Sequence, residues 1–175
     1  MSEIIISENA FSNNILTTYN VQNGITNLTI GIMAFNCCKN LTTFNIPDSV
    51  TNLTICDFAF SGCTVLNTFT IPNSVQNLII GNSAFYSCTG LKTFTIPNKD
   101  TIITISANAF KNCNLLQPFT IPVNVANLTF HMKLSTITTQ DISVNVNIGD
   151  NVCNVVKNYK LDPDKITRLS SHYKN

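Results

Sequence analysis

The sequence predicts a repeat solenoid, in which coils of about 25 residues stack with a parallel β-sheet on the concave face. Short second strands and single helical turns are expected opposite that sheet. The first observation is repetition: "AFYSCTGLKTFTIPN" at residues 84–98 is a near copy of "AFSGCTVLNTFTIPN" at 59–73. The second is the alternation of apolar and polar residues within each copy, which is the period of a strand with one buried face. The third is composition, with 44% apolar and only 11% charged residues.

The repeat is recognised by columns of equivalent residues that recur every 25 positions. Four full copies start at the Ala-Phe pairs 34–35, 59–60, 84–85 and 109–110, and Ala10-Phe11 begins a copy that is one residue shorter. The columns are Cys38, Cys63, Cys88 and Cys113; Leu41, Leu66, Leu91 and Leu116; Phe44, Phe69, Phe94 and Phe119; Ile46, Ile71, Ile96 and Ile121; and Pro47, Pro72, Pro97 and Pro122.

Taken in chain order, the first element is a strand in "SEIIIS". Ile4 and Ile6 match Leu28 and Ile30 of the next copy, and Glu3 with Glu8 makes the exposed edge less sticky. Each copy then contains "AFxxCxxL", too short for a full helix and read as one helical turn or bend. A strand in "LxxFxIP" follows, which Pro ends because it has no N–H for the ladder. A second strand comes last, in segments such as "NLTI" at 27–30 and 52–55 and "NLII" at 77–80.

Such coils must stack in order to fold. Each copy offers about nine inward side chains, and burial of a large one contributes about 1.5–3 kcal/mol. Ordering the backbone costs about 1–2 kcal/mol per residue, so an isolated coil is unstable. Stacking adds interstrand hydrogen bonds and places equivalent side chains about 4.8 Å apart.

The expected organisation is a solenoid with an N-terminal capping strand over residues 1–130, followed by a degenerate repeat and C-terminal cap over 131–175. "ISVNVNIG" at 142–149 alternates like a strand. The Asp-Pro-Asp at 162–164 is a typical helix start with Pro at the first position, so a helix is expected there.

The unit "AFxxCxxLxxFxIPxxVxxLxI" over residues 4–130 resembles the leucine-rich repeat of the BspA-like class, found in microbial and protozoan surface proteins. The resemblance implies a right-handed solenoid with a parallel sheet lining one face. It also implies a non-enzymatic protein that acts in adhesion or protein–protein interaction. The common step of 25 residues is slightly long for the class, and the N-terminus has no basic segment of the kind that begins a secretion signal.

The column of cysteines invites a metal or disulfide interpretation. Paired ligand spacing such as C-x₂-C is absent, and only two histidines accompany the seven cysteines. Stacked cysteines could reach one another as disulfides. Because each lies at an inward position, buried free thiols are the favoured interpretation. Cys37, Cys56 and Cys153 fall outside the column, and Cys37 could be an exposed reactive thiol, although an inert surface thiol is the plainer interpretation.

No Gly-rich phosphate loop, nucleophile elbow or paired-carboxylate motif is present, so no enzymatic activity and no cofactor are expected. The net charge of +1 gives no case for binding nucleic acid, and no apolar run is long enough for membrane insertion. The expected partner is a protein. The location is open between the cytoplasm and a cell surface reached by unconventional export.

The outward positions of the first strand carry short polar side chains. Rows of hydroxyls and amides on a rigid sheet offer hydrogen bonds at little cost in side-chain entropy, so they are the expected binding surface. The alternatives are a merely solvated face, because Thr favours strands, and an ice-binding ladder, which Asn20, Asn45 and Pro118 would interrupt. A second candidate is the loop at Lys99 and Asp100, where Asp replaces the Val expected in an inward column. The candidate partner-binding residues are Thr43, Asn45, Thr68, Thr70, Thr93, Thr95 and Thr120.

Overall fold

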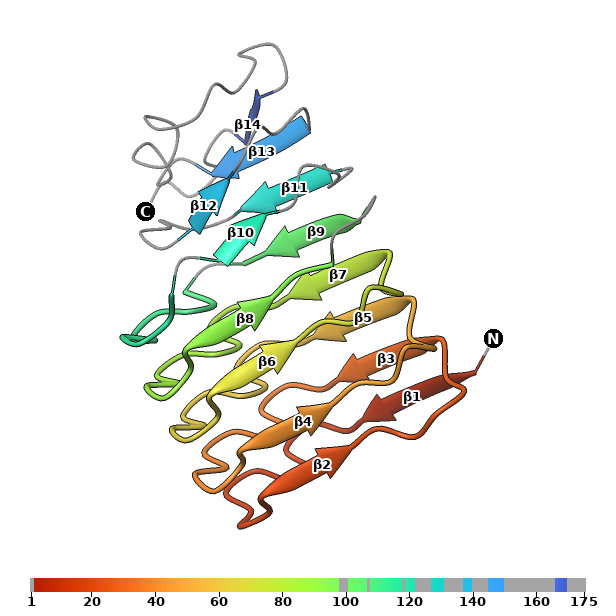
Figure 1. The fold of residues 1–175 in the computed structure, drawn as a ribbon, viewed down its shortest axis with the longest axis vertical. Coiled ribbons are helices and arrows are strands. Elements are labelled where there is room, and N and C mark those ends of the chain that lie inside the picture. The colour runs from red at the N-terminus through yellow and green to blue at the C-terminus, as the bar shows by residue number, and fades with distance from the viewer. Residues whose placement is uncertain are drawn as a thin grey trace.

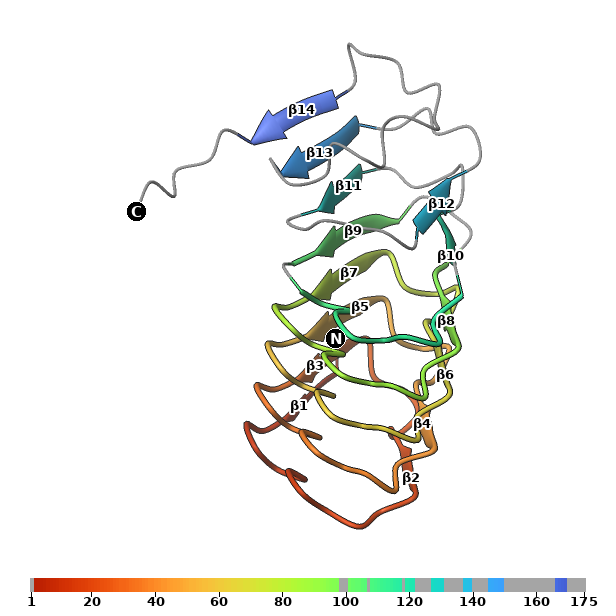
Figure 2. The same cartoon turned by 90° about the vertical axis from the view of Figure 1, so that its left-hand side faces the viewer.

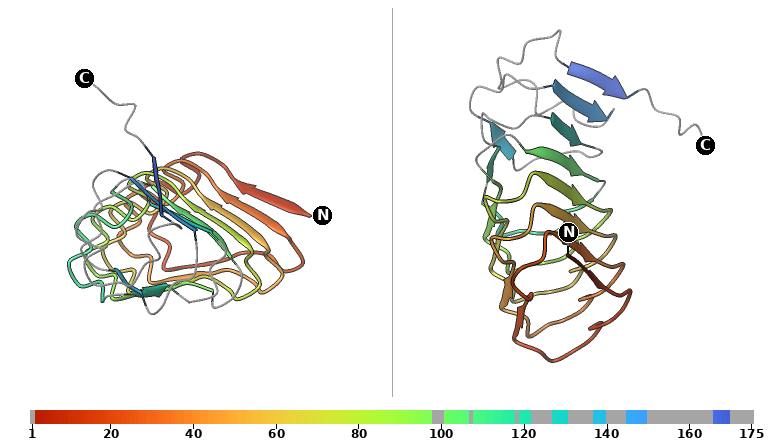
Figure 3. Two further views of the ribbon diagram at one scale, coloured as in Figure 1. Left: turned by 90° about the horizontal axis from the view of Figure 1, so that it is seen from above. Right: turned by 90° about the vertical axis from the view of Figure 1, so that its right-hand side faces the viewer.

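A computed structural model describes residues 2–97, 101–106 and 108–117, together with the backbones of the strands at 119–121, 127–130, 137–139, 145–149 and 166–169. Successive turns of the chain stack along the long axis of the molecule (Figures 1 and 2). Seen along that axis, the coils overlie one another and enclose a common interior (Figure 3). The predicted repeat solenoid is therefore confirmed.

The long side of the solenoid is an eight-stranded parallel sheet in the order β1-β3-β5-β7-β9-β11-β13-β14. The predicted register is confirmed at its N-terminal end, where Ile4 pairs with Leu28 and Ile6 with Ile30. Further along, partners differ by 25 residues, as in Leu28 with Leu53 and Leu53 with Leu78. The strands are β1 Glu3–Ile6, β3 Asn27–Ile30, β5 Asn52–Ile55, β7 Asn77–Ile80, β9 Ile102–Ile105, β11 Asn127–Phe130, β13 Asn145–Gly149 and β14 Ile166–Leu169.

The other side of the solenoid carries the strands that come from the "LxxFxIP" segments. These strands are three residues long and form parallel pairs, β2 with β4, β6 with β8 and β10 with β12. The four-residue "NLTI" strands thus form the longer and more continuous sheet, and the Pro-terminated strands form the shorter ones. The shorter strands are β2 Thr18–Asn20, β4 Thr43–Asn45, β6 Thr68–Thr70, β8 Thr93–Thr95, β10 Phe119–Ile121 and β12 Ile137–Thr139.

The "AFxxCxxL" segment forms consecutive tight turns where a helical turn or bend was expected. In the second coil, the N–H groups of Ala34, Asn36 and Cys38 donate to carbonyls three residues back. The intervening N–H groups of Met33, Phe35 and Cys37 donate instead to the next coil at 2.7–3.0 Å. Met33 and Cys37 have φ of 54° and 57°. Because the N–H groups alternate between turn and neighbouring coil, stacking also satisfies the backbone outside the sheets.

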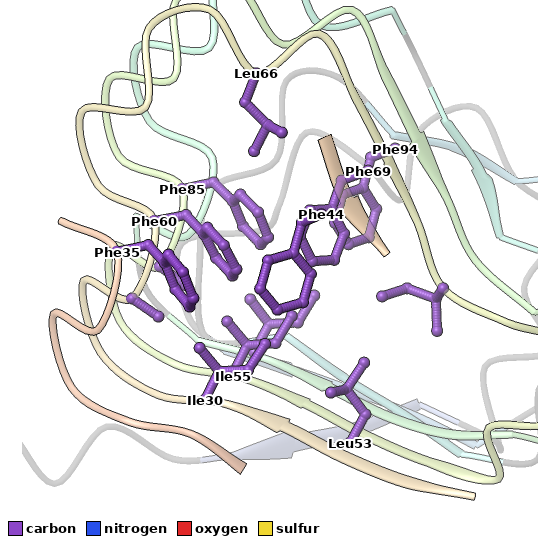
Figure 4. Close-up of a cluster of buried hydrophobic side chains, with 14 of the residues drawn as sticks. Ile30, Phe35, Phe44, Leu53, Ile55, Phe60, Leu66, Phe69, Phe85 and Phe94 are labelled. Atoms are coloured by element: carbon purple, nitrogen blue, oxygen red, sulfur yellow. The ribbon is translucent and has the colours of Figure 1, made fainter. Parts of the chain in front are cut away.

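The core between the two sides consists of columns of identical side chains. Phe35, Phe60 and Phe85 form one column and are fully buried. Their ring centroids lie 5.2 and 5.3 Å apart with nearly parallel planes. A second column contains Phe44, Phe69 and Phe94 and meets the first edge to face (Figure 4). Offset stacked and edge-to-face pairs contribute about 0.5–1.5 kcal/mol each beyond area burial, so the repeat gains from every additional coil.

The C-terminal part departs from one expectation. Residues 145–149 form β13 within the predicted strand segment 142–149 and pair with β11. The helix expected from Asp162 onwards is wrong at residues 166–169, which form β14 beside β13. Ile166 and Thr167 are β-branched and favour an extended backbone, and the edge of β13 offers them hydrogen-bond partners that a short helix lacks.

Candidate partner-binding face

The candidate face lies on the outer surface of β2, β4, β6 and β8. In each three-residue strand the middle side chain points into the core, because successive side chains of a strand point to opposite faces. Phe44, Phe69 and Phe94 are buried as a result. The flanking residues are all exposed on these strands, and the predicted ones with described side chains are Thr43, Asn45, Thr68, Thr70, Thr93 and Thr95.

The four threonines of β6 and β8 form a two-by-two grid. Thr68 is the direct partner of Thr93, and Thr70 of Thr95. The N–H of Ile71 donates to the carbonyl of Thr95 at 3.0 Å and continues the pairing beyond the strands. Adjacent parallel strands lie about 4.8 Å apart, so four hydroxyl groups are held at fixed spacings on a backbone that cannot easily deform.

The neighbouring pair β2–β4 presents a different chemistry. Thr18 pairs with Thr43 and Asn20 with Asn45. The Nδ2 of Asn45 donates to Oδ1 of Asn20 at 2.6 Å, so part of the amide capacity of this pair is used within the protein. Among the described strands, β4 and β6 belong to separate two-stranded sheets. The face is therefore a Thr/Asn pair of strands beside a Thr/Thr pair, not one uniform ladder.

Not every predicted site residue can be placed. Thr120 lies on β10, but its side chain falls outside the described residues. The candidate loop site at Lys99 and Asp100 also lies outside them. The placed members carry hydroxyl or amide groups with no formal charge. Lys92, which is exposed and directly precedes Thr93, adds a cation at the border of the grid.

The cysteine column is a structural feature of the core. Cys38, Cys63, Cys88 and Cys113 are buried free thiols, as the sequence predicts. Each Sγ donates to the carbonyl of a Phe in the preceding coil, as Cys63 does to Phe35 at 3.1 Å. Burial raises the pKa of the Cys63 thiol, and the neighbouring Cys38 adds to this. A hydrogen bond with Cys113 and burial raise the pKa of the Cys88 thiol. These thiols are therefore protonated and poorly nucleophilic.

The two thiols outside the column are more accessible. Cys37 and Cys56 are half-buried free cysteines. Burial, and then the nearby carboxylate of Asp57, raises the pKa of Cys56. Within the described ranges, no group of three or more His, Cys, Asp or Glu side chains is arranged to hold a metal ion. The described part of the chain also contains no helix that is long and apolar enough to cross a bilayer.

The sequence reasoning missed a ladder of asparagines on the long sheet. Asn52 Nδ2 donates to Asn27 Oδ1 at 2.7 Å, and Asn77 Nδ2 donates to Asn52 Oδ1 at 2.6 Å. The 25-residue spacing of Asn27, Asn52 and Asn77 was the available signal. Because these amides bond to one another between coils, this ladder fixes coil register and offers a partner less than the free hydroxyls opposite.

The comparisons with known proteins agree with this architecture. A model of the BspA-type leucine-rich repeat region matches six copies over residues 4–132. The chain belongs to this family, whose members are generally non-enzymatic modules for adhesion or protein–protein interaction and are often surface-associated. Comparison with curated proteins finds no match.

Among solved structures, a leucine-rich repeat protein of T. pallidum is similar with a TM-score of 0.63 and 22% identity, over 91% of this chain and 78% of that one. A leucine-rich cell surface protein of Faecalibacterium prausnitzii is similar with a TM-score of 0.42 and 19% identity, over 74% and 37%. A leucine-rich repeat protein of Bacteroides ovatus gives a TM-score of 0.33 and 17% identity, over 93% and 69%. The first of these shows the fold.

Proposed function

We propose that this chain is a non-catalytic protein-binding module that engages its partner through the Thr/Asn face of β2, β4, β6 and β8. The observation that carries the proposal is the grid of Thr68, Thr70, Thr93 and Thr95, whose side chains are exposed and set in register. Hydroxyl groups on short side chains donate and accept hydrogen bonds and lose little rotamer entropy on binding. Many modest contacts of this kind suit recognition of a protein surface.

The site is expected to bind by shape and hydrogen bonding more than by charge. The placed candidate residues carry no formal charge, and the whole chain has a net charge of +1. Binding should therefore depend weakly on salt, in contrast to an electrostatically steered complex. Within this proposal the partner's surface is polar and flat, and it lies along the stacking direction of the coils.

The test is capture of partners from the source cells on immobilised protein. The variant Thr68→Lys/Thr93→Lys places two ammonium groups on the grid and leaves the core untouched. A matched control, Thr29→Lys/Thr54→Lys, makes the same change at outward positions of β3 and β5 on the long sheet. Partners retained by wild type and control but lost from the grid variant support the proposed face. Equal retention by both variants would move the binding site elsewhere.

Where the module acts is a separate question. Adhesion at a cell surface and scaffolding inside the cell both use the same fold. Labelling of intact source cells with a membrane-impermeant biotin reagent separates them. Labelling before lysis supports adhesion, and labelling only after lysis supports the intracellular scaffold.

An ice-binding role is the alternative for the threonine grid. The grid favours it only over β6 and β8, since β2 and β4 carry asparagine in the second column. A protein-binding module should show no thermal hysteresis in dilute solution, whereas an ice-binding solenoid should show a clear gap between freezing and melting temperatures.

A further inference from the structure

The corner that follows each long-sheet strand carries two columns of outward residues. The first column runs Glu8, Ile32, Asp57 and Asn82, and the second runs Asn9, Met33, Phe58 and Ser83. Stacking is direct at this corner, because the N–H of Asn9 donates to the carbonyl of Ile32 and that of Met33 to the carbonyl of Asp57. Ile32, Met33 and Phe58, here called the corner patch, are exposed by 43%, 36% and 37%.

The backbone at the corner patch is unusual for such residues. Met33 and Phe58 have φ of 54° and 56°, in the left-handed region. The equivalent positions of other coils hold Asn9, Ser83 and Asn108 at φ of 56°, 53° and 56°. Small polar residues tolerate this conformation far better than bulky apolar ones. Two bulky residues that are both strained and exposed, side by side, are better explained by contact with a partner than by folding.

The charges around the corner patch indicate what kind of partner it fits. Glu8 and Asp57 are the residues before and after Ile32 in the first column, in the adjacent coils. The Asp57 carboxylate accepts the N–H of Asn82 at 2.7 Å and stays partly exposed. No Lys or Arg lies in either column of the described coils. An apolar centre between two carboxylates complements an apolar side chain that has a cationic neighbour.

We propose that the corner patch is a second interaction surface, and that it binds a protein segment presenting an apolar side chain next to Lys or Arg. The apolar side chain packs on Met33 and Phe58, where the flexible thioether adapts to its shape. The cation reaches Glu8 or Asp57. A two-fold contact with a second copy is disfavoured, because it would bring the carboxylates of both copies together. This surface is distinct from the Thr/Asn face and does not depend on it.

The test is selection from a displayed library of random twelve-residue peptides on the immobilised full chain. Met33→Asn/Phe58→Ser removes the patch by inserting residues that the chain itself uses at equivalent positions and at the same φ, so the variant should keep its fold. Val65→Asn is the matched control: Val65 is 44% exposed at another corner, and Asn40 is its equivalent in the preceding coil. Glu8→Gln/Asp57→Asn tests the charges without removing side-chain oxygens.

We expect the selected peptides to contain an apolar residue beside Lys or Arg. They should bind Met33→Asn/Phe58→Ser at least about tenfold more weakly than wild type, weaken with salt and with Glu8→Gln/Asp57→Asn, and ignore Val65→Asn. Peptides that bind the patch variant as well as wild type, or that lack basic residues, would overturn the proposal. So would self-association of wild type in sedimentation that Met33→Asn/Phe58→Ser abolishes, since the occupant would then be a second copy.

Discussion

The aromatic columns predict that a ring in the middle of the stack contributes more to stability than the equivalent ring at its end. Phe60 is fully buried. Its ring stacks on Phe35 and Phe85 at 5.2 and 5.3 Å and meets Phe44 and Phe69 edge to face at 5.0 and 5.1 Å. Replacing a buried Phe by Ala typically costs about 3–5 kcal/mol. Because Phe60→Ala removes four ring contacts, we expect about 4–5 kcal/mol, a large part of the 5–15 kcal/mol that stabilises a typical domain.

Phe11→Ala is the matched control for this prediction. Phe11 occupies the equivalent position in the first coil, is only partly buried, and contacts Phe35 and Tyr19, each at 5.0 Å. With one neighbouring coil missing, its loss should cost about 1–2 kcal/mol. Urea unfolding followed by circular dichroism measures both. Equal costs for the two variants would refute the view that stacking on both sides makes the core.

The remaining stability predictions concern the thiols and a glycine. Cys38, Cys56, Cys63 and Cys88 have pKa values raised by folding, so the folded state keeps protons that the unfolded state releases above its ordinary thiol value of 9.0. The free energy of unfolding should therefore be constant below about pH 8 and fall as pH rises through 9 and beyond; a flat profile from pH 8 to 10 would show that the thiols are not held neutral. Gly81→Ala should destabilise by about 2–3 kcal/mol, because a Cβ there would lie 2.5 Å from Asp57 Oδ1 and 2.7 Å from Asp57 N. Gly24→Ala, which meets nothing within 4 Å but has φ of +84°, should cost only about 1 kcal/mol, and thermal melting of both variants compares them.

The sequence was informative about this fold because one physical pattern recurs. A 25-residue step places Phe44, Phe69 and Phe94 in one column, and the alternation in each strand fixes which side chains point inward. The register of β1 on β3 followed from matching Ile4 and Ile6 to Leu28 and Ile30. Burial of the column cysteines followed from their place among those apolar positions.

Other features depend on geometry that residue types do not encode. The tight turns of the "AFxxCxxL" segment require left-handed backbone at Met33 and Phe58, which neither residue would suggest. Which of the two strands builds the continuous sheet depends on where the twist of the stack keeps neighbouring strands in register. Pro also shortens the ladder at Pro47 and Pro72. The corner patch becomes visible only when Ile32, Met33 and Phe58 are placed in adjacent coils.

The central claim is that a partner binds the Thr/Asn face, and site-specific cross-linking tests it most directly. A photoreactive amino acid would replace Thr93 in one sample and Thr54, on the long sheet, in another, and both would be irradiated in source-cell extract. The account predicts cross-linked protein partners from position 93 and none in common from position 54. Partners cross-linked from position 54 but not from position 93 would contradict it.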